Sequence, residues 1–259
     1  MANTDMDEPT GDRDFVASLE KGLAVIEAFD ASRPRLTLTD VAKLTGITRA
    51  AARRYLRTLT KLNYADFDGR YFSLSPRILR LGYAYLSSTS LSLRLQPFLE
   101  KISQETGESS SAAVLDGDDI VYIARSATRR IMSIGLGVGS RLPAYCTSLG
   151  RAILAYQTPA EIEAYLERVK LEPKTPKTLT QKSDLRAALE AARQQGYAMV
   201  SEELEFGLQS IAVPLIQKND KITIALNISA QAARVSAQEM EERFLPTLRE
   251  ASEALRYTF

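Results

Sequence analysis

The sequence predicts an α+β fold in two domains, and three patterns support that prediction. Apolar residues recur every three or four positions in residues 14–30 and 38–61, which indicates helices. A polar break at Ser87–Ser90 separates this part from the remainder. In the remainder, helical segments and antiparallel hairpins are mixed without a strict βαβ alternation, as in α+β domains. The length of 259 residues suits one or two domains with a hydrophobic core.

The first predicted helix covers residues 14–30 and has one apolar side. We expect that side to pack behind the two helices that follow. Its apolar residues are Phe15, Val16, Leu19, Leu23, Ile26 and Phe29. Ser32-Arg33-Pro34 then ends the helix.

Residues 38–61 predict two helices around a tight turn. Thr37 and Asp40 have the spacing of a capping box, which opens the first of these helices. Gly46 interrupts the pattern at the turn. Thr48 can cap the second helix, because its hydroxyl can accept a hydrogen bond from an otherwise unpaired backbone N–H.

The second of these helices has an apolar face and a basic face. Ala52, Leu56 and Leu59 should face a core. The arginines on its other side are Arg49, Arg53 and Arg57, four residues apart, with Arg54 beside them. No Asp or Glu lies between Val41 and Ala65, so the usual i,i+4 ion-pair partners are missing. A solvated charged face is the alternative, but a Gly turn followed by an Arg-rich helix is typical of a DNA-binding helix-turn-helix.

An Asp-Gly turn at residues 68–70 predicts a β-hairpin that would be the wing of a winged helix-turn-helix. Its strands would be Tyr64–Phe67 and Tyr71–Leu74. The candidate DNA-binding residues are Thr48, Arg49, Arg53, Arg54, Arg57 and Arg70. Arg49 and Arg53 lie where recognition helices reach base edges, and we expect the other arginines to hold phosphates.

The charge of the chain is unevenly distributed. Residues 33–82 contain 11 Lys and Arg against 3 Asp and Glu, a net charge of +8. The rest of the chain contains 22 against 29, a net charge of −7. A basic module joined to a mildly acidic one is the electrostatic pattern of a DNA-binding head on a different body.

The composition excludes several kinds of site. The chain has no histidine, which removes Ser-His-Asp catalysis, Cys-His catalysis and His-based zinc sites. The glycine-rich run of residues 135–140 fails the G-x-G-x-x-G spacing, and no P-loop is present, so we read the glycines as a turn between strands. Lys- or carboxylate-based chemistry stays open on composition alone. In the absence of a catalytic motif, we expect no metal, no cofactor and no catalytic residue.

The same composition indicates where the protein resides. Cys146 is the only cysteine, which allows no internal disulfide and fits a reducing cytoplasm. No apolar run approaches the ~20 residues of a membrane span, and the polar, acidic N-terminus does not resemble a signal peptide. We expect a cytoplasmic protein.

A linker helix is predicted to begin at Ser75-Pro76 and to run to about Ser87. Tyr83 and Leu86 make it apolar on more than one side, which favours a dimer over a helix buried between two domains of one chain. The expected organisation is a disordered tail over residues 1–13, a winged helix-turn-helix over 14–75, a linker and dimerisation helix over 76–89, and a second domain over 90–259.

The second domain should contain both helices and strands. The predicted helices are Leu91–Thr106, Gly150–Tyr156, Pro159–Val169, Ser183–Gln195 and Ala237–Tyr257. The predicted strands are Ser109–Leu115, Ile120–Ala124, Ile131–Leu136, Tyr197–Val200, Ile211–Leu215 and Ile222–Ile228.

These segments, in this order, resemble the IclR family of bacterial transcription regulators over nearly the whole chain. In the N-terminal part the resemblance rests on LTDVAKLTGITRAAARRYLRTL, DGRYFSL and SPRILRLGYAYL. In the C-terminal part it rests on AAVLDGDDIVYIAR, VGSRLPAYCTSLGRAILA, GYAMVSEELEFGLQSIAVP and ALNIS. TRAAARRYL, ESSSAAVLDGDDIVYIAR, TRRIMS and YCTSLGRAILA are most similar to the subgroup that controls β-ketoadipate-pathway genes for protocatechuate and 4-hydroxybenzoate catabolism.

The resemblance implies a winged-helix head, a dimerising linker helix and a GAF-like α+β domain that binds a small aromatic or keto acid as effector. It implies a homodimer, often a dimer of dimers, on palindromic double-stranded operator DNA. Members of the subgroup are mostly activators, which would act on RNA polymerase. The alternatives are a regulator of another catabolic operon, and an enzyme with a basic docking module.

The resemblance also implies which residues meet the effector. They are Ile131, Ser133, Thr147, Ser148, Leu149, Gly150, Ser201, Leu208, Ser210, Asn227 and Ser229. Ser201 stands where many members have Asp, and Ser210 stands where some have Cys, so the effector cannot be copied from one relative. We place Leu208 and Ser210 on a loop, and Asn227 and Ser229 on the last strand. We expect Cys146 to be a small apolar filler.

The start of the helix near residues 147–150 should bind a carboxylate. Unpaired backbone N–H groups and the helix dipole favour an anion there without a fixed cation. The alternative is that these hydroxyls only satisfy backbone groups in turns.

Overall fold

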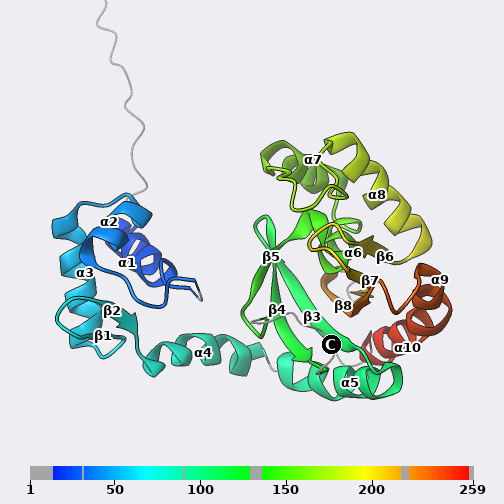
Figure 1. Cartoon of the computed structure of the whole chain (residues 1–259), viewed down its shortest axis with the longest axis horizontal. Helices are drawn as coiled ribbons and strands as arrows, with labels where there is room; N and C mark the ends of the chain where they lie inside the picture. Colours follow the sequence, from blue (N-terminus) through cyan, green and yellow to red (C-terminus); the bar gives the residue numbers. More distant parts are fainter. Residues whose placement is uncertain (1–13, 31, 90, 129–135, 217–221, 257–259) are drawn as a thin grey trace, which may run out of the picture. The chain divides into compact units, whose positions relative to one another are not determined.

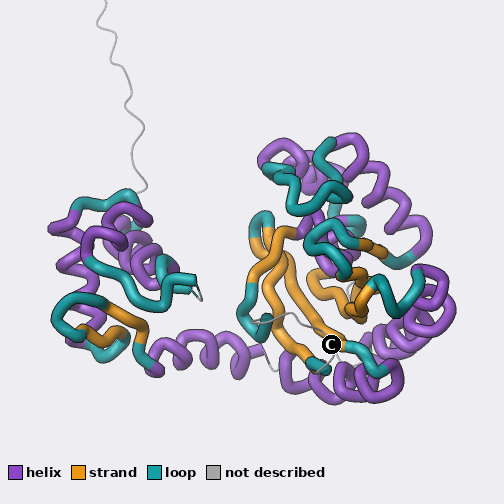
Figure 2. The backbone as a smooth tube through the Cα atoms, viewed as in Figure 1, coloured by secondary structure: helices purple, strands orange, loops and turns teal. Residues whose placement is uncertain are grey.

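A computed structural model describes residues 14–30, 32–89, 91–128, 136–216 and 222–256 (Figures 1 and 2). The chain forms two compact units that divide between Ala84 and Tyr85. The tail of residues 1–13 and residues 131–135 of the third predicted strand lie outside the described residues. Each unit is considered by itself below.

The N-terminal unit contains three helices and a hairpin. They are α1 (Ala17–Glu27), α2 (Leu38–Thr45), α3 (Arg49–Lys61), β1 (Ala65–Phe67) and β2 (Phe72–Leu74). The predicted capping box is confirmed, since Asp40 N donates to Thr37 Oγ1 and Thr37 N donates to Asp40 Oδ2. Gly46 ends α2 with a φ of 68°, a left-handed conformation that glycine adopts without strain.

The core of this unit buries only part of the apolar side of α1. Val25 of α1 is fully buried with Val41, Leu56 and Phe72. The helix packs against α2 and α3 as expected, but it is shorter than the predicted range of 14–30, and the apolar residues at its N-terminal end are exposed. The exposed side chains there are Phe15 (57%), Val16 (59%), Leu19 (62%) and Leu23 (46%). Helical spacing shows which side is apolar, but it does not show what covers that side.

The wing has the turn that its sequence predicts. Asp68 Oδ1 accepts from the backbone N–H groups of Arg70 (2.9 Å) and Tyr71 (2.7 Å). Gly69 has a φ of 101°. The carboxylate therefore closes the turn, and the two strands pair antiparallel from Ala65 to Leu74.

The linker begins with a short 3-10 turn, Pro76–Ile78, and continues as α4 (Leu79–Thr89). Ser75 caps it through a hydrogen bond from Arg77 N to Ser75 Oγ. The side chain of Leu86 lies outside the described residues. Leu79 (71%) and Tyr83 (70%) are strongly exposed.

The C-terminal unit is built on a six-stranded antiparallel sheet of order β5-β4-β3-β8-β7-β6. Its strands are β3 (Ser109–Asp116), β4 (Asp119–Ser126), β5 (Arg141–Pro143), β6 (Ala198–Ser201), β7 (Leu208–Ile216) and β8 (Ile222–Gln231). Its helices are α5 (Leu91–Thr106), a 3-10 turn (Ala144–Cys146), α6 (Ser148–Leu154), α7 (Pro159–Arg168), α8 (Lys182–Gln195), α9 (Ala237–Glu239), a π-helical turn (Met240–Phe244) and α10 (Leu245–Arg256).

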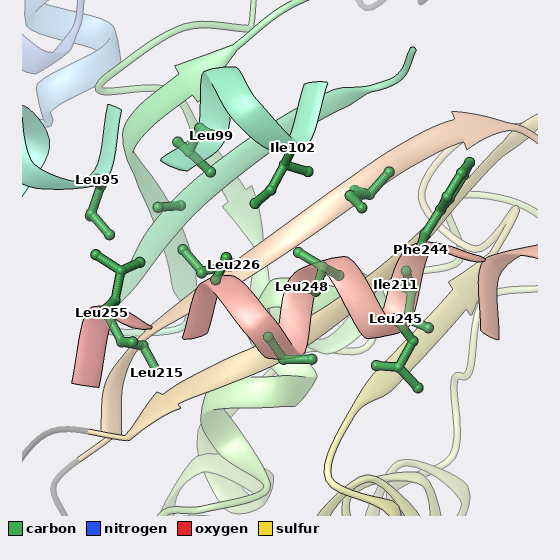
Figure 3. Close-up of a cluster of buried hydrophobic side chains, with 14 of the residues drawn as sticks. Leu95, Leu99, Ile102, Ile211, Leu215, Leu226, Phe244, Leu245, Leu248 and Leu255 are labelled. Atoms are coloured by element: carbon green, nitrogen blue, oxygen red, sulfur yellow. The ribbon is translucent and has the colours of Figure 1, made fainter. Parts of the chain in front are cut away.

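Helices cover both faces of the sheet (Figure 1). On one face, α5 and α10 bury a cluster that includes Leu99, Leu226 and Leu248 (Figure 3). On the other face, α6 packs against small side chains such as Ala212 and Ala225. Because successive residues of a strand point to opposite faces, this alternation divides each central strand between two cores.

Gly150 sets how closely α6 approaches the preceding turn. A Cβ at this position would lie 2.2 Å from the carbonyl oxygen of Ala144, a backbone atom that cannot move aside. No larger residue fits there, so the first turn of α6 is held against residues 144–146.

A buried ion pair joins α6 to the turn between β6 and β7. Arg151 donates to both carboxylate oxygens of Glu203, at 2.7 and 2.5 Å, and its Nε donates to Tyr145 O at 2.8 Å. Leu179 N donates to Glu203 Oε2 at 3.2 Å. Thr178 Oγ1 donates to Glu203 O at 2.6 Å. The pair therefore connects three segments that are distant in sequence.

We predict that Glu203→Gln destabilises the protein strongly. Removing one charge leaves Arg151 buried without its counterion, which should lower the free energy of unfolding by about 3–5 kcal/mol. Urea denaturation followed by circular dichroism measures this change. Glu163→Gln is the matched control: the Glu163–Arg186 pair is about half exposed, so its loss should cost about 1 kcal/mol or less. Equal losses in the two variants would contradict the role given to the buried pair.

Candidate functional site

The basic face of α3 is exposed and has no acidic partner in the part of the chain that the structure describes. Its arginines, Arg49, Arg53, Arg54 and Arg57, are all exposed. Among the described residues, no ion pair joins any of them to an Asp or Glu. On the opposite side, Ala52 and Leu56 are fully buried, so packing fixes which way the basic face points. Exposed guanidinium groups without counterions suit a polyanionic partner.

Thr48 has a structural task in this helix. Its Oγ1 accepts from Ala51 N at 3.2 Å and so caps α3. The cap predicted from the sequence is confirmed. A cap at this point also holds the first turn of α3, where Arg49 begins the basic face.

The wing carries a second basic group, which includes one residue that sequence reasoning missed. The Arg70 guanidinium lies 5.1 Å from the centre of the Tyr71 ring, and the Arg35 guanidinium lies 4.9 Å from it. Arg35 also forms an ion pair with Asp68 of the turn. Arg35 lies before α2 in the sequence, so only the tertiary fold brings it to the wing.

The C-terminal unit contains a small cavity between the sheet and α6, with an interior volume of about 30 Å³. The lining residues are Tyr122, Arg125, Leu136, Leu142, Cys146, Thr147, Ser148, Leu149, Val200, Leu204, Leu208, Ser210, Asn227 and Ser229.

Many of the candidate effector residues line this cavity, and some do not. Those at the wall are Thr147, Ser148, Leu149, Leu208, Ser210, Asn227 and Ser229. Gly150 and Ser201 are not among the lining residues. Gly150 serves the close approach to Ala144, and Ser201 ends β6 opposite Gln209. Ile131 and Ser133 lie outside the described residues.

One expected position is corrected by the structure. Leu208 and Ser210 belong to strand β7, which begins at Leu208, and they do not lie on a loop. They were misplaced because the apolar run that signals this strand starts only at Ile211. Asn227 and Ser229 lie on the last strand, β8, as expected.

Sequence reasoning also missed half of the cavity wall. The missed residues are Tyr122, Arg125, Leu136, Leu142, Val200 and Leu204, and Cys146 was expected only as a filler. Arg125 lies just after the predicted strand Ile120–Ala124, so no pattern in the sequence singled it out. It adds to the wall a guanidinium that the expected anion site at the start of α6 did not include.

Three polar atoms at the wall are buried without a hydrogen-bond partner among the described residues: Arg125 Nε, Ser148 Oγ and Asn227 Oδ1. Ser148 is 1% exposed and Asn227 is 3% exposed. Such orphans are rare, because a buried polar group without a partner costs free energy. Their gathering in one cavity indicates that a bound molecule supplies the missing partners.

The start of α6 contributes less than expected. Thr147 Oγ1 donates to Ala144 O at 3.3 Å and accepts from Gly150 N at 3.1 Å, so its hydrogen bonds serve the fold. For Thr147 the alternative of a hydroxyl that satisfies backbone groups therefore holds. The hydroxyl of Ser148 remains the available polar group on this helix.

Burial also sets the ionisation of the cavity wall. It raises the pKa of the Cys146 thiol to about 11, and the negative charge of Glu203 adds to this rise. Burial also raises the pKa of the Tyr122 phenol, against the opposing charge of Arg125. Both groups are therefore neutral at pH 7, and the full charge at the described wall is that of Arg125.

The described residues contain no group of three or more His, Cys, Asp or Glu side chains placed to hold a metal ion. No helix among them is long and apolar enough to cross a membrane.

Known proteins match both units. Residues 18–69 match the IclR helix-turn-helix domain, and residues 83–257 match the family described as bacterial transcriptional regulator IclR C-terminal.

Individual relatives match over most of the chain. The Pca regulon regulatory protein of Pseudomonas putida is 49% identical over 95% of this chain and 85% of its own. The p-hydroxybenzoate hydroxylase transcriptional activator of Acinetobacter baylyi is 39% identical over 99% of this chain and 96% of its own.

A solved structure matches the C-terminal part. It is the inducer-binding domain of a PobR double mutant from Acinetobacter in complex with 3-hydroxybenzoic acid. It is 32% identical, covers 65% of this chain and 99% of its own, and superposes with a TM-score of 0.62. Together with the two matching domains, these likenesses show that the chain belongs to the IclR family of bacterial transcriptional regulators.

Proposed function

We propose that this protein is a transcription regulator of aromatic-acid catabolism that binds DNA through its N-terminal unit and a small aromatic or keto acid through its C-terminal unit. The observation that carries the proposal is the cavity with three orphaned polar atoms, in a chain that also has an unpaired basic helix. The relatives named for the Pca regulon and for p-hydroxybenzoate hydroxylase support the choice of pathway. The family consists of regulators, so we do not expect an enzyme.

The DNA-binding part of the proposal rests on α3 and the wing. Arg49 and Arg53 lie in the first half of α3, so we assign them to base edges in the major groove. We assign Arg54, Arg57 and Arg70 to phosphates, because they lie farther along the helix or on the wing. Thr48 would support the reading residues through the cap that it provides.

The effector part rests on Arg125 at the cavity wall. A carboxylate that enters the cavity would accept from Arg125 Nε and neutralise the guanidinium in a water-poor site, where charged hydrogen bonds are strong. Apolar walls such as Leu149, Val200 and Leu208 would hold a ring or a short carbon chain.

A homodimer is also part of the proposal. The exposed apolar residues of α1, together with Leu79 and Tyr83 of α4, are more than scattered surface positions. A second copy would cover them. A two-fold dimer would also present two copies of α3 to the two halves of a palindromic operator.

We also propose that the protein activates transcription. The Acinetobacter relative at 39% identity is named an activator, which supports activation through RNA polymerase here as well. A protein that binds chromosomal DNA in a bacterium would act in the cytoplasm.

The DNA assignment predicts two different kinds of loss. Arg53→Ala should weaken operator binding by about 1–3 kcal/mol and relax specificity at one base pair. Arg57→Ala should weaken binding to all sequences alike and reduce the slope of log K against log salt by about one. Fluorescence anisotropy on the promoter beside the gene, over a salt series, measures both.

Arg186→Ala, which removes the same charge from α8 in the C-terminal unit, is the control and should bind DNA like the wild type. Unchanged operator affinity in both α3 variants would mean that α3 is not the reading helix.

The effector assignment predicts that the wild type binds protocatechuate, 4-hydroxybenzoate or β-ketoadipate in calorimetry. Arg125→Leu should weaken that binding by about 1.5–3 kcal/mol, the worth of a charged hydrogen bond. Arg168→Leu removes an exposed arginine that pairs with Asp118 away from the cavity, and it should bind like the wild type. The pathway assignment fails if the wild type binds none of the three acids.

The single cysteine gives a separate test of where the effector binds. Because the pKa of Cys146 is raised to about 11, thiol alkylation should be slow at pH 7 and should rise towards pH 10 as the thiolate forms. An effector in this cavity should slow the alkylation further, since Cys146 is at its wall. Binding in calorimetry with no protection of Cys146 would put the effector elsewhere.

The dimer proposal predicts a concentration-independent dimer at micromolar protein in sedimentation equilibrium. Tyr83→Glu should weaken the dimer by about 2 kcal/mol or more, since buried tyrosines are frequent hot spots of interfaces. Phe206→Glu, which changes an aromatic residue of similar exposure in the other unit, should leave the dimer intact. A wild-type protein that sediments as a monomer would remove this part of the proposal.

A further inference from the structure

The cavity wall specifies more than the presence of an acid, because its orphaned atoms are of two chemical kinds. Arg125 Nε is a donor in every state of the side chain, and Ser148 Oγ can donate or accept. Asn227 Oδ1 is an amide oxygen and can only accept. A ligand that satisfies all three must therefore bring an acceptor to Arg125 and a donor to Asn227.

The environment of Asn227 determines which end of its amide meets the ligand. Its Nδ2 donates to Ser229 Oγ at 3.1 Å, and this bond leaves Oδ1 as the free atom. A carboxylate has no proton to donate, so it cannot satisfy Oδ1. A hydroxyl group can, and so the position of Asn227 favours an alcohol or a phenol.

The charge of the cavity wall also favours a ligand with one carboxylate and a hydroxyl group. Among the described lining residues, Arg125 is the one that carries a full charge at pH 7. One carboxylate balances it. A second carboxylate would be buried beside Asn227 without a counterion, which carries a large desolvation cost.

The register of the sheet gives the spacing of the two groups. Ser111 of β3 lies opposite Arg125 of β4 on one side and opposite Asn227 of β8 on the other. Residues directly opposite one another point to the same face, and strands are ~4.8 Å apart, so the two backbones are separated by about 10 Å. Ser111 Oγ accepts from Arg125 Nη1 at 3.4 Å and steadies the guanidinium between them. The donor and the acceptor therefore come from two strands that β3 separates, on the same face of the sheet.

We propose that the effector is a hydroxylated monocarboxylic acid and that Asn227 selects its hydroxyl group. The carboxylate accepts from Arg125 Nε and Ser148 Oγ, and the hydroxyl at the far end of the ligand donates to Asn227 Oδ1. This inference rests on the proposed function, and it narrows the effector from any small aromatic or keto acid to a hydroxy acid. A hydroxyaromatic acid fits the apolar walls, and a dicarboxylate does not fit the charge.

The test compares ligands that differ by one group, with the full-length protein in calorimetry. The series is benzoate, the three hydroxybenzoates, the three methylbenzoates, protocatechuate, adipate and β-ketoadipate. A methyl group has nearly the size of a hydroxyl but cannot donate. At least one hydroxybenzoate should bind about tenfold or more tightly than both benzoate and its methyl isostere, because a site built for a hydroxyl rejects an analogue that leaves its polar group unpaired. Both dicarboxylates should bind more weakly than that hydroxybenzoate.

Two variants assign the selection to Asn227. Asn227→Leu removes the acceptor, so the hydroxyl and methyl isosteres should bind alike, while the affinity for benzoate changes by less than about threefold. Asn227→Asp keeps an acceptor and should retain the preference for hydroxyl over methyl, although its charge should weaken every acid. Circular dichroism and the alkylation rate of Cys146 without ligand check that both variants keep the fold and the cavity.

The outcomes separate this inference from the proposed function. If no acid in the series binds the wild type, the proposed function fails. If benzoate binds as tightly as every hydroxybenzoate, or if Asn227→Leu keeps the hydroxyl preference, an effector site exists but the assignment of Asn227 is wrong. If a dicarboxylate binds most tightly, Nδ2 and not Oδ1 faces the cavity, and the inference is overturned while the regulator remains.

Discussion

The buried ion pair of Arg151 and Glu203 is the interaction on which the C-terminal unit depends. Two charges inside a protein are stable only when each of their hydrogen-bonding atoms is satisfied. Here the guanidinium meets the carboxylate and Tyr145 O, and the carboxylate also accepts from Leu179 N. Glu203 directly precedes Leu204, which lines the cavity, so the ion pair also holds this part of the cavity wall in place.

Both units mark their binding surface in the same physical way, through polar groups that the fold leaves without partners. On α3, the arginines have no acid among the described residues. In the cavity, Arg125, Ser148 and Asn227 have buried atoms without a hydrogen bond among the described residues. Glu108 and Tyr165 have such atoms outside the cavity, whereas the capping box of Thr37 and the turn of Asp68 satisfy their backbone groups locally. The informative feature is therefore that three unpaired atoms gather in one cavity.

The sequence predicted an element well where the residues that determine it are neighbours in the chain. The helix-turn-helix followed from neighbours in the chain: Thr37, Gly46 and Thr48 act within a few residues of themselves. Helix α5 was predicted with its observed bounds, even though it contains Pro97, because its apolar spacing is regular and Gly107 ends it. The start of β7 was missed because the apolar run that indicates the strand begins only at Ile211, and the strand itself begins at Leu208.

The cavity was less predictable, because it is made by register and by tertiary contact. Family resemblance led to Ser148 and Asn227, but Arg125 becomes significant only when Ser111 is seen between it and Asn227. Gly150 was assigned to the effector, and its actual constraint is the distance of its missing Cβ from Ala144. The spacing of residues in the sequence does not predict this contact between Gly150 and Ala144.

The first turn of α6 has a consequence for how such a regulator can change its inducer during evolution. Thr147 caps the helix, Gly150 permits the close backbone approach, and Arg151 forms the ion pair. Substitutions at these positions would destabilise the fold, and selection would remove them. Ser210 and Ser229 line the same cavity from β7 and β8, where the strands are already held by their ladder. Substitutions that change which inducer is bound should therefore occur on the sheet side of the cavity. A mutant library for a biosensor should vary those strand positions.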